Sequence, residues 1–144
     1  MTHPAPSLRA TLRCHVATPS RVKLSVTADV QAQADALRLR YTLRGDTRLL
    51  RIPAPTAPVP TDGLWRHTCF EAFVAADDEP AYREFNFSPS SAWAAYRFAS
   101  ERQRDPNAEA RESVLLRPPQ VTVTPQAITL TVRVPATALP RSPA

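Results

Sequence analysis

The sequence predicts an all-β fold, a single antiparallel β-sandwich built from 144 residues. Two observations lead to this prediction: apolar and polar residues alternate along several segments, and turn residues separate those segments. Strict alternation is typical of a strand with one buried face, because successive side chains point to opposite sides of a sheet. Several such strands joined by turns indicate a sandwich or a barrel. The length fits one domain with a sizeable core.

Alternating segments flank the central part of the chain on both sides. They span residues 8–14, 22–30, 37–43 and 128–134. In the third segment, Leu37, Leu39 and Tyr41 alternate with Arg38 and Arg40. Each predicted strand therefore has one apolar face and one face suited to water, as expected for antiparallel sheets with one solvated side.

Proline and charge mark the connections between the strands, since the chain has 16 prolines and only 2 glycines. Asp62-Gly63 favours a turn into a new strand. Residues 53–60, PAPTAPVP, are predicted to form an extended connection that cannot join a central ladder. Residues 100–113 are densely charged, and we expect a solvated loop there with a short helical turn over residues 107–112.

The formal net charge of +5 raises the question of nucleic-acid binding. The arginines are scattered over alternating strand positions, which favours a solvated sheet face instead. No apolar run approaches the roughly 18 residues that a membrane helix needs, and residues 1–13 lack the apolar centre of a secretory signal. We therefore expect no nucleic-acid partner, no membrane partner and a cytoplasmic location.

Residues 62–98 form the most informative segment, because they contain both tryptophans. Within the second predicted strand, alternation places Arg83 and Asn86 on opposite sides. Within the third, Trp93 and Arg97 share one side. The three strands predicted for this segment cover residues 66–75, 82–87 and 93–98.

The order LWxxTCFExF, then YxEFNFSPS, then AWAAYxF resembles the bacterial DOMON-like domains. These are similar in turn to family 9 carbohydrate-binding modules and to haem- or sugar-binding DOMON domains. Residues 64–73 and 82–98 carry most of the resemblance. It implies an antiparallel β-sandwich of jelly-roll or immunoglobulin-like type, and it implies no known catalytic activity.

The resemblance also implies further strands, with a His-Pro-containing segment, beyond the strand at residues 127–134. The sequence instead stops at LPRSPA. We therefore expect a single DOMON-like domain over residues 1–144, truncated at its C-terminus and lacking the last strands. A sandwich of this kind leaves backbone donors and acceptors unpaired along an edge. A homo-oligomer or a partner strand at this exposed C-terminal edge is the expected consequence.

Six residues of the central segment are candidate ligand contacts. An indole face stacks well on the C–H face of a sugar ring, and a few convergent polar groups fix the ligand's orientation. The alternative for both tryptophans is packing in the core. A carboxylate on a central strand needs a partner, so an ion pair from Glu71 to Arg83 or Arg97 is also expected. The candidates are Trp65, Glu71, Arg83, Asn86, Trp93 and Arg97.

Catalytic and cofactor motifs are not found in the sequence. It contains no GxSxG, P-loop or GxGxxG pattern, and two glycines cannot build a phosphate cradle. His67, Cys69 and Glu71 share one strand face, but steps of roughly 6.6 Å between alternate positions separate them too far for one ion. We expect no metal and no cofactor, and neither Met1 nor the histidines suit haem ligation.

The sequence therefore predicts a non-enzymatic ligand-binding or accessory domain, for a carbohydrate or another small polar ligand. The alternative is a structural or protein-interaction module without a small-molecule site. In that case the aromatic segment is purely core, and the exposed edge pairs with another chain. The exposure of Trp65 and Trp93 distinguishes these hypotheses.

Overall fold

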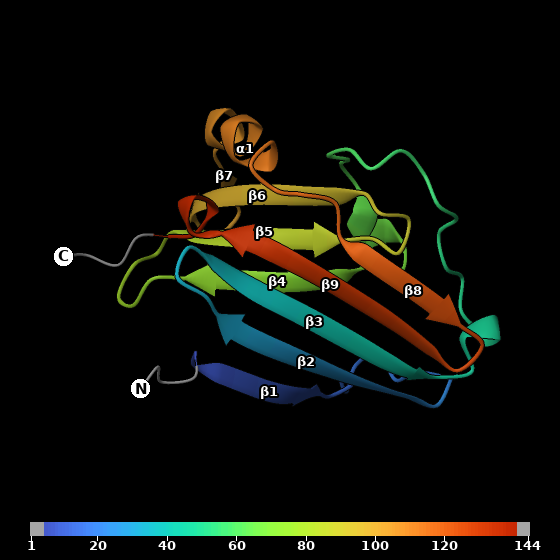
Figure 1. The fold of residues 1–144 in the computed structure, drawn as a ribbon. Helices are drawn as coiled ribbons and strands as arrows, with labels where there is room; N and C mark the ends of the chain where they lie inside the picture. Colours follow the sequence, from blue (N-terminus) through green and yellow to red (C-terminus); the bar gives the residue numbers. More distant parts are fainter. Residues whose placement is uncertain (1–4, 141–144) are drawn as a thin grey trace.

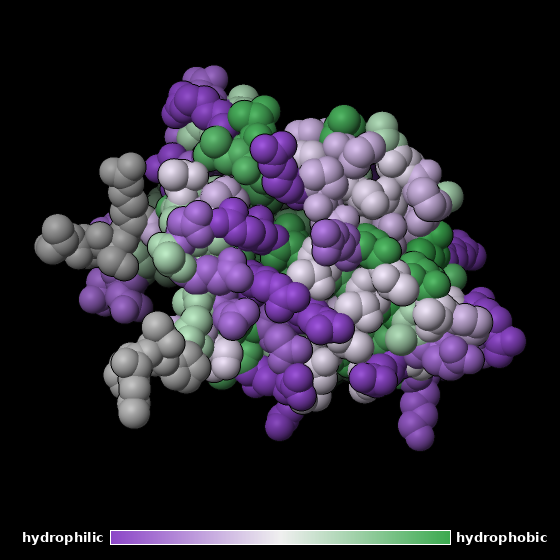
Figure 2. Space-filling view, in the orientation of Figure 1, coloured by the Kyte–Doolittle hydropathy of each residue, from purple (hydrophilic) through white to green (hydrophobic). Residues whose placement is uncertain are grey.

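The computed structural model describes residues 5–140 as two antiparallel β-sheets packed face to face (Figure 1). The predicted all-β sandwich is confirmed. Figure 2 shows that hydrophilic side chains cover much of the outer face of the larger sheet, as the alternating arginines predicted. Among the described residues, no helix is long and apolar enough to cross a membrane.

The larger sheet has five strands in the order β1-β2-β3-β9-β8. Its strands are β1 (Ser7–Leu12), β2 (Leu24–Ala32), β3 (Ala36–Gly45), β8 (Gln120–Thr124) and β9 (Ala127–Pro135). The end of β3 requires glycine. Gly45 has a φ of +152°, and a Cβ atom there would lie 2.7 Å from the carbonyl oxygen of Lys23.

The smaller sheet has four strands in the order β4-β5-β6-β7. Its strands are β4 (Phe70–Ala75), β5 (Tyr82–Phe87), β6 (Trp93–Ser100) and β7 (Gln103–Arg104). The first of these begins later than the predicted Arg66, because the chain first makes the 3-10 turn η2 (Leu64–Arg66) after the left-handed Gly63. Two further 3-10 turns are η1 (Thr47–Leu49) and η3 (Ala136–Ala138).

The short helix α1 (Pro106–Ser113) packs against β6 at one side of the sandwich (Figure 1). Its first turn is well specified, because the Asp105 carboxylate accepts a hydrogen bond from the Ala108 N–H and proline occupies the start. The predicted helical turn over residues 107–112 is confirmed. Its setting differs from the expected solvated loop, since Ala108, Glu109 and Glu112 are buried.

The core lies between the two sheets, on the faces that alternation predicted. In the larger sheet, Leu39 is paired with Val132 and Tyr41 with Leu130, so the apolar residues of neighbouring strands form rows. The fully buried side chains of this core include Phe85, Phe87, Ile128, Leu130 and Val134.

The last described strand, β9, is interior rather than at an edge. It pairs with β3 on one side and with β8 on the other. We expected an unpaired edge at the C-terminal strand, but β8, which sequence reasoning did not predict, covers that position. Within residues 5–140, the strands with a free edge are β1 and β8 in the larger sheet and β4 and β7 in the smaller one.

The inner face of β1 is largely uncovered. Leu8 is 66% exposed and Leu12 is 49% exposed, although alternation places both on the core side. The five-stranded sheet is wider than the four-stranded one, so β1 extends past the free edge of β4. A groove of about 320 Å³ runs there, lined by Leu12, Val26, Tyr41, Leu43 and residues 68–71.

Candidate functional site

The two tryptophans do not share a surface. Trp93 is only 5% exposed, and its indole N–H donates to the Ser113 carbonyl at 3.0 Å, which ties α1 to the core. Trp65 lies in η2 and is 57% exposed, with the Arg66 guanidinium 5.1 Å from its ring centroid. The buried indole of Trp93 therefore has no open face for the predicted stacking on a sugar ring, whereas the indole of Trp65 is accessible.

Glu71 is exposed on the outer face of the smaller sheet. Its carboxylate accepts a contact from the Cys69 thiol at 3.3 Å, and its backbone carbonyl accepts a hydrogen bond from the Tyr41 hydroxyl at 3.0 Å. The predicted ion pair with Arg83 or Arg97 is wrong, because both arginines lie on the inner face. Burial, followed by the contact with Glu71, raises the pKa of Cys69 to about 12.

Asn86 is fully buried opposite Glu71 in the ladder between β4 and β5. In the orientation that satisfies its hydrogen bonds, its amide donates to the Glu84 carboxylate at 3.3 Å and to the Phe85 carbonyl at 3.1 Å. Burial raises the pKa of Glu84, and the negative charge of Glu71 raises it further. Asn86 therefore hydrogen-bonds within the group of polar side chains formed by Cys69, Glu71 and Glu84 on the outer face of the smaller sheet. It does not face the arginines.

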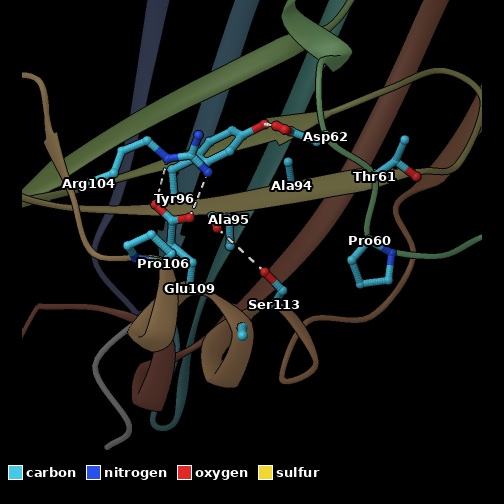
Figure 3. A pocket seen from close by; sticks show the side chains of 11 residues that line it. Pro60, Thr61, Asp62, Ala94, Ala95, Tyr96, Arg104, Pro106, Glu109 and Ser113 are labelled. Carbon is cyan, nitrogen blue, oxygen red and sulfur yellow. Dashed lines mark hydrogen bonds and ion pairs between the residues drawn. The ribbon is translucent and has the colours of Figure 1, made fainter.

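A cavity of about 290 Å³ lies between residues 60–62, β6 and α1, and we call it the tyrosine cavity (Figure 3). The Tyr96 hydroxyl donates to the Asp62 carboxylate, and the Arg104 guanidinium lies 4.6 Å from the Tyr96 ring centroid. Arg104 also donates twice to Glu109, from Nε at 3.0 Å and from Nη2 at 2.7 Å.

The polar groups of the tyrosine cavity are therefore engaged with one another. Glu109 accepts a third hydrogen bond, from the Arg97 backbone N–H at 3.1 Å. The hydrogen bond from Tyr96 is the main cause that lowers the pKa of Asp62. Burial, together with that bond, raises the pKa of Tyr96 to about 12. These hydrogen bonds hold residues 60–62 and α1 against the sheet. They leave few polar groups of the cavity free to bind a ligand.

A second cavity, of about 450 Å³, is also lined by α1, through Glu112, and we call it the arginine cavity. Arg83 on β5 and Arg97 on β6 are directly opposite each other in the ladder. Glu112 on α1 lies between them: Arg97 Nη1 donates to Oε1 at 3.0 Å, and Arg83 Nε is 3.3 Å from Oε2. The cavity is lined by Ala76, Glu79, Ala81, Arg83, Arg97, Glu112, Thr137, Leu139 and Pro140.

Arg83 is the least satisfied polar side chain of this cavity. The residue is 6% exposed, yet its buried Nε has no acceptor in hydrogen-bonding geometry within residues 5–140, although Glu112 is near. Burial lowers the pKa of Arg83, and the positive charge of Arg97 adds to this effect against the opposing influence of Glu112. A buried polar group without its hydrogen bond costs free energy, so the ion pair with Glu112 is the interaction that offsets the burial of Arg83.

Two of the six predicted candidates, Arg83 and Arg97, thus converge on one cavity. Sequence reasoning missed their shared partner, Glu112, because residues 100–113 read as a solvated loop. A usable signal was present: Asp105-Pro106 is typical of a helix start, and Glu109 and Glu112 are three residues apart, on one helix face. Among the described residues, no group of three His, Cys, Asp or Glu side chains is placed to hold a metal ion.

Comparison of the chain with protein-family models, with curated proteins and with solved structures finds no match.

Proposed function

We propose that this chain is a non-enzymatic ligand-binding domain that holds a small polar ligand, with saccharides as one class, in the arginine cavity. The observation that carries the proposal is that Arg83 and Arg97 share the single carboxylate of Glu112 at the wall of an open volume of about 450 Å³. Such a volume falls in the range of roughly 300–1,000 Å³ that small-molecule sites occupy.

The shape of the cavity supports binding of a ligand rich in acceptors. Arg83, Arg97 and Glu112 reach it from two strands and a helix, so rigid elements hold the polar groups. Thr137, after β9, adds a hydroxyl from a fourth element. Convergence of a few polar groups in a concave site is typical of ligand binding. The resemblance of residues 64–98 to DOMON-like domains agrees with a binding role without catalysis.

The test is a screen of soluble mono- and disaccharides by ligand-observed NMR on the unmodified chain and on Arg97→Gln. Arg97 is suited to substitution because its side chain is 38% exposed. Arg38→Gln, on the outer face of the larger sheet, is the matched control. Saturation transfer to a saccharide that Arg97→Gln abolishes and Arg38→Gln preserves supports the proposal. Equal transfer in all three proteins contradicts the assigned site.

A second candidate function is an interaction module, favoured by the exposed Leu8 and Leu12 beside the free edge of β4. An added strand would pair with β4 and cover this apolar face. Analytical ultracentrifugation tests the homo-oligomeric form of this idea. A dimer that Leu12→Arg dissociates supports it, and a monomer at every concentration contradicts it.

A further inference from the structure

We infer that the ligand of the arginine cavity carries a carboxylate, and that an acidic saccharide is the best-matched class. This inference rests on the proposed function and names the ligand's charge. It follows from the arrangement of Arg83, Arg97 and Glu112, which brings two guanidinium groups to one carboxylate.

The ion-pair cluster of Arg83, Arg97 and Glu112 carries one positive charge in excess. The side chains of Arg83 and Glu112 are 8% and 11% exposed, so water screens them weakly. Arg97, directly opposite Arg83 in the ladder, adds a second positive charge. Like charges that face each other on neighbouring strands repel, and a single carboxylate compensates only one of them.

Glu112 also hydrogen-bonds only one of the two arginines. Its Oε1 accepts from Arg97 at 3.0 Å, whereas its Oε2 lies 3.3 Å from Arg83 Nε without forming a hydrogen bond. A second carboxylate in the cavity would bring two carboxylates to two guanidinium groups. The planar donors of arginine match the two oxygens of a carboxylate, which makes this anion a specific partner.

The remaining charged groups near the cavity do not remove the excess. Glu79 lines the cavity but is exposed, so its charge is solvated and acts weakly. Asp105, at the start of α1, also acts on Arg83 but forms no ion pair with either arginine among the described residues. An excess of one charge favours a monoanion, because a phosphate dianion would place a further negative charge beside Glu112.

The tyrosine cavity provides an internal reference for this inference. Arg104 and Glu109 pair there one to one, with two hydrogen bonds, on the same helix and the same sheet. No charge is left in excess in that pair, so it has no need of an anion. Arg104→Gln is therefore a matched control that removes an arginine outside the lining of the arginine cavity.

The experiment is isothermal titration calorimetry of the unmodified chain, Arg97→Gln and Arg104→Gln, with near-ultraviolet circular dichroism to confirm that each protein is folded. Glucuronate and glucose, which differ in one carboxylate, are the main probes, and glucose 6-phosphate and acetate are added. We expect glucuronate to bind at least tenfold more tightly than glucose. We also expect Arg97→Gln to weaken glucuronate binding at least tenfold and Arg104→Gln to change it less than twofold.

The outcomes separate this inference from the proposed function. Glucose binding as tight as glucuronate binding, and lost in Arg97→Gln, would contradict the carboxylate and leave the ligand-binding function standing. Tighter binding of glucose 6-phosphate would contradict the preference for a monoanion. Acetate binding alone, sensitive to Arg97→Gln, would support the carboxylate and overturn the saccharide class. Binding of none of the four probes at millimolar concentration would overturn the inference, and the neutral saccharide screen would then decide the function.

Discussion

The tyrosine cavity and the arginine cavity are both lined by α1, which contributes one buried glutamate to each. Glu109 meets Arg104 in a one-to-one pair with two hydrogen bonds, and it also accepts a backbone N–H. Glu112 meets two arginines and hydrogen-bonds only one of them. Arginines of one sheet and glutamates of one helix thus give a fully hydrogen-bonded contact in the tyrosine cavity and an incompletely hydrogen-bonded one in the arginine cavity.

From this difference we propose that the number of carboxylates per arginine, rather than the presence of ion pairs, distinguishes a structural contact from a binding site. A buried polar network stabilises a fold when all of its groups are hydrogen-bonded. A network with a group left without a hydrogen bond can still bind a further polar partner. Substitutions that alter one of the two cavities at a time test this distinction.

The largest effect is expected for Glu112→Gln. The substitution leaves Arg83 and Arg97 facing each other without a carboxylate, and breaking a buried pair in this way costs about 3 kcal/mol. Urea denaturation followed by circular dichroism measures the loss. Glu79→Gln, which changes an exposed glutamate at the same cavity, should cost below about 0.5 kcal/mol. A loss for Glu112→Gln as small as that of its control would contradict the described ion pairs.

Glu109→Gln should destabilise the chain by about 2 kcal/mol, less than Glu112→Gln. The Arg104 side chain is 45% exposed, so water can replace part of what it loses, and glutamine retains one acceptor. The free energy of unfolding in urea again provides the measurement. A cost above that of Glu112→Gln would reverse the proposed ranking of the two cavities.

Arg83→Met should change the stability by about 1 kcal/mol or less, in either direction. It removes a buried charge whose Nε lacks an acceptor, and Glu112 keeps its hydrogen bond to Arg97. Thermal unfolding of this variant beside Arg104→Met gives a matched pair, because Arg104 makes two good hydrogen bonds. The account fails on this point if Arg83→Met is much the more destabilising of the two.

The tyrosine cavity should also show a defined dependence on pH. The hydrogen bond from Tyr96 lowers the pKa of Asp62 below its ordinary value of 3.8. Because the folded pKa is the lower one, this stabilisation is complete above the ordinary value and is lost as the pH falls through the folded pKa. Asp62→Asn should therefore be less stable than the unmodified chain near neutral pH, and the difference should shrink below pH 3.8. A difference that grows in acid would contradict the assigned hydrogen bond.

The smallest effect is expected for Trp65→Ala. The side chain is 57% exposed in η2, so its loss should cost less than about 0.5 kcal/mol. It should also leave glucuronate binding unchanged, because Trp65 does not line the arginine cavity. A tenfold loss of binding would move the site to the outer face and away from the arginines.

Much of the fold could be predicted from alternation, because a period of two is set by strand geometry alone. The faces assigned to Arg83, Asn86, Trp93 and Arg97 agree with the structure. The strand β8 was missed because its alternating residues are short and mostly exposed. The exposure of Leu8 was not foreseen either, since the relative widths of two sheets depend on long-range pairing.

The site was predicted in part, because a sequence pattern reveals the face of a residue but seldom its partner. Glu71 was paired with Arg83 although alternation along the strands places the two on opposite sides of the sheet. The true partner, Glu112, comes from a helix whose docking on β6 depends on tertiary packing. The buried tryptophan hydrogen bond to Ser113 has the same origin.

The most direct test of the central claim follows the side-chain Nε–H signals of the arginines by NMR during titration with glucuronate. If the arginine cavity takes a carboxylate, the signals of Arg83 and Arg97 shift together and saturate, while that of Arg104 stays in place. A shift confined to Arg104, or no shift at any of the three at millimolar glucuronate, would contradict the account.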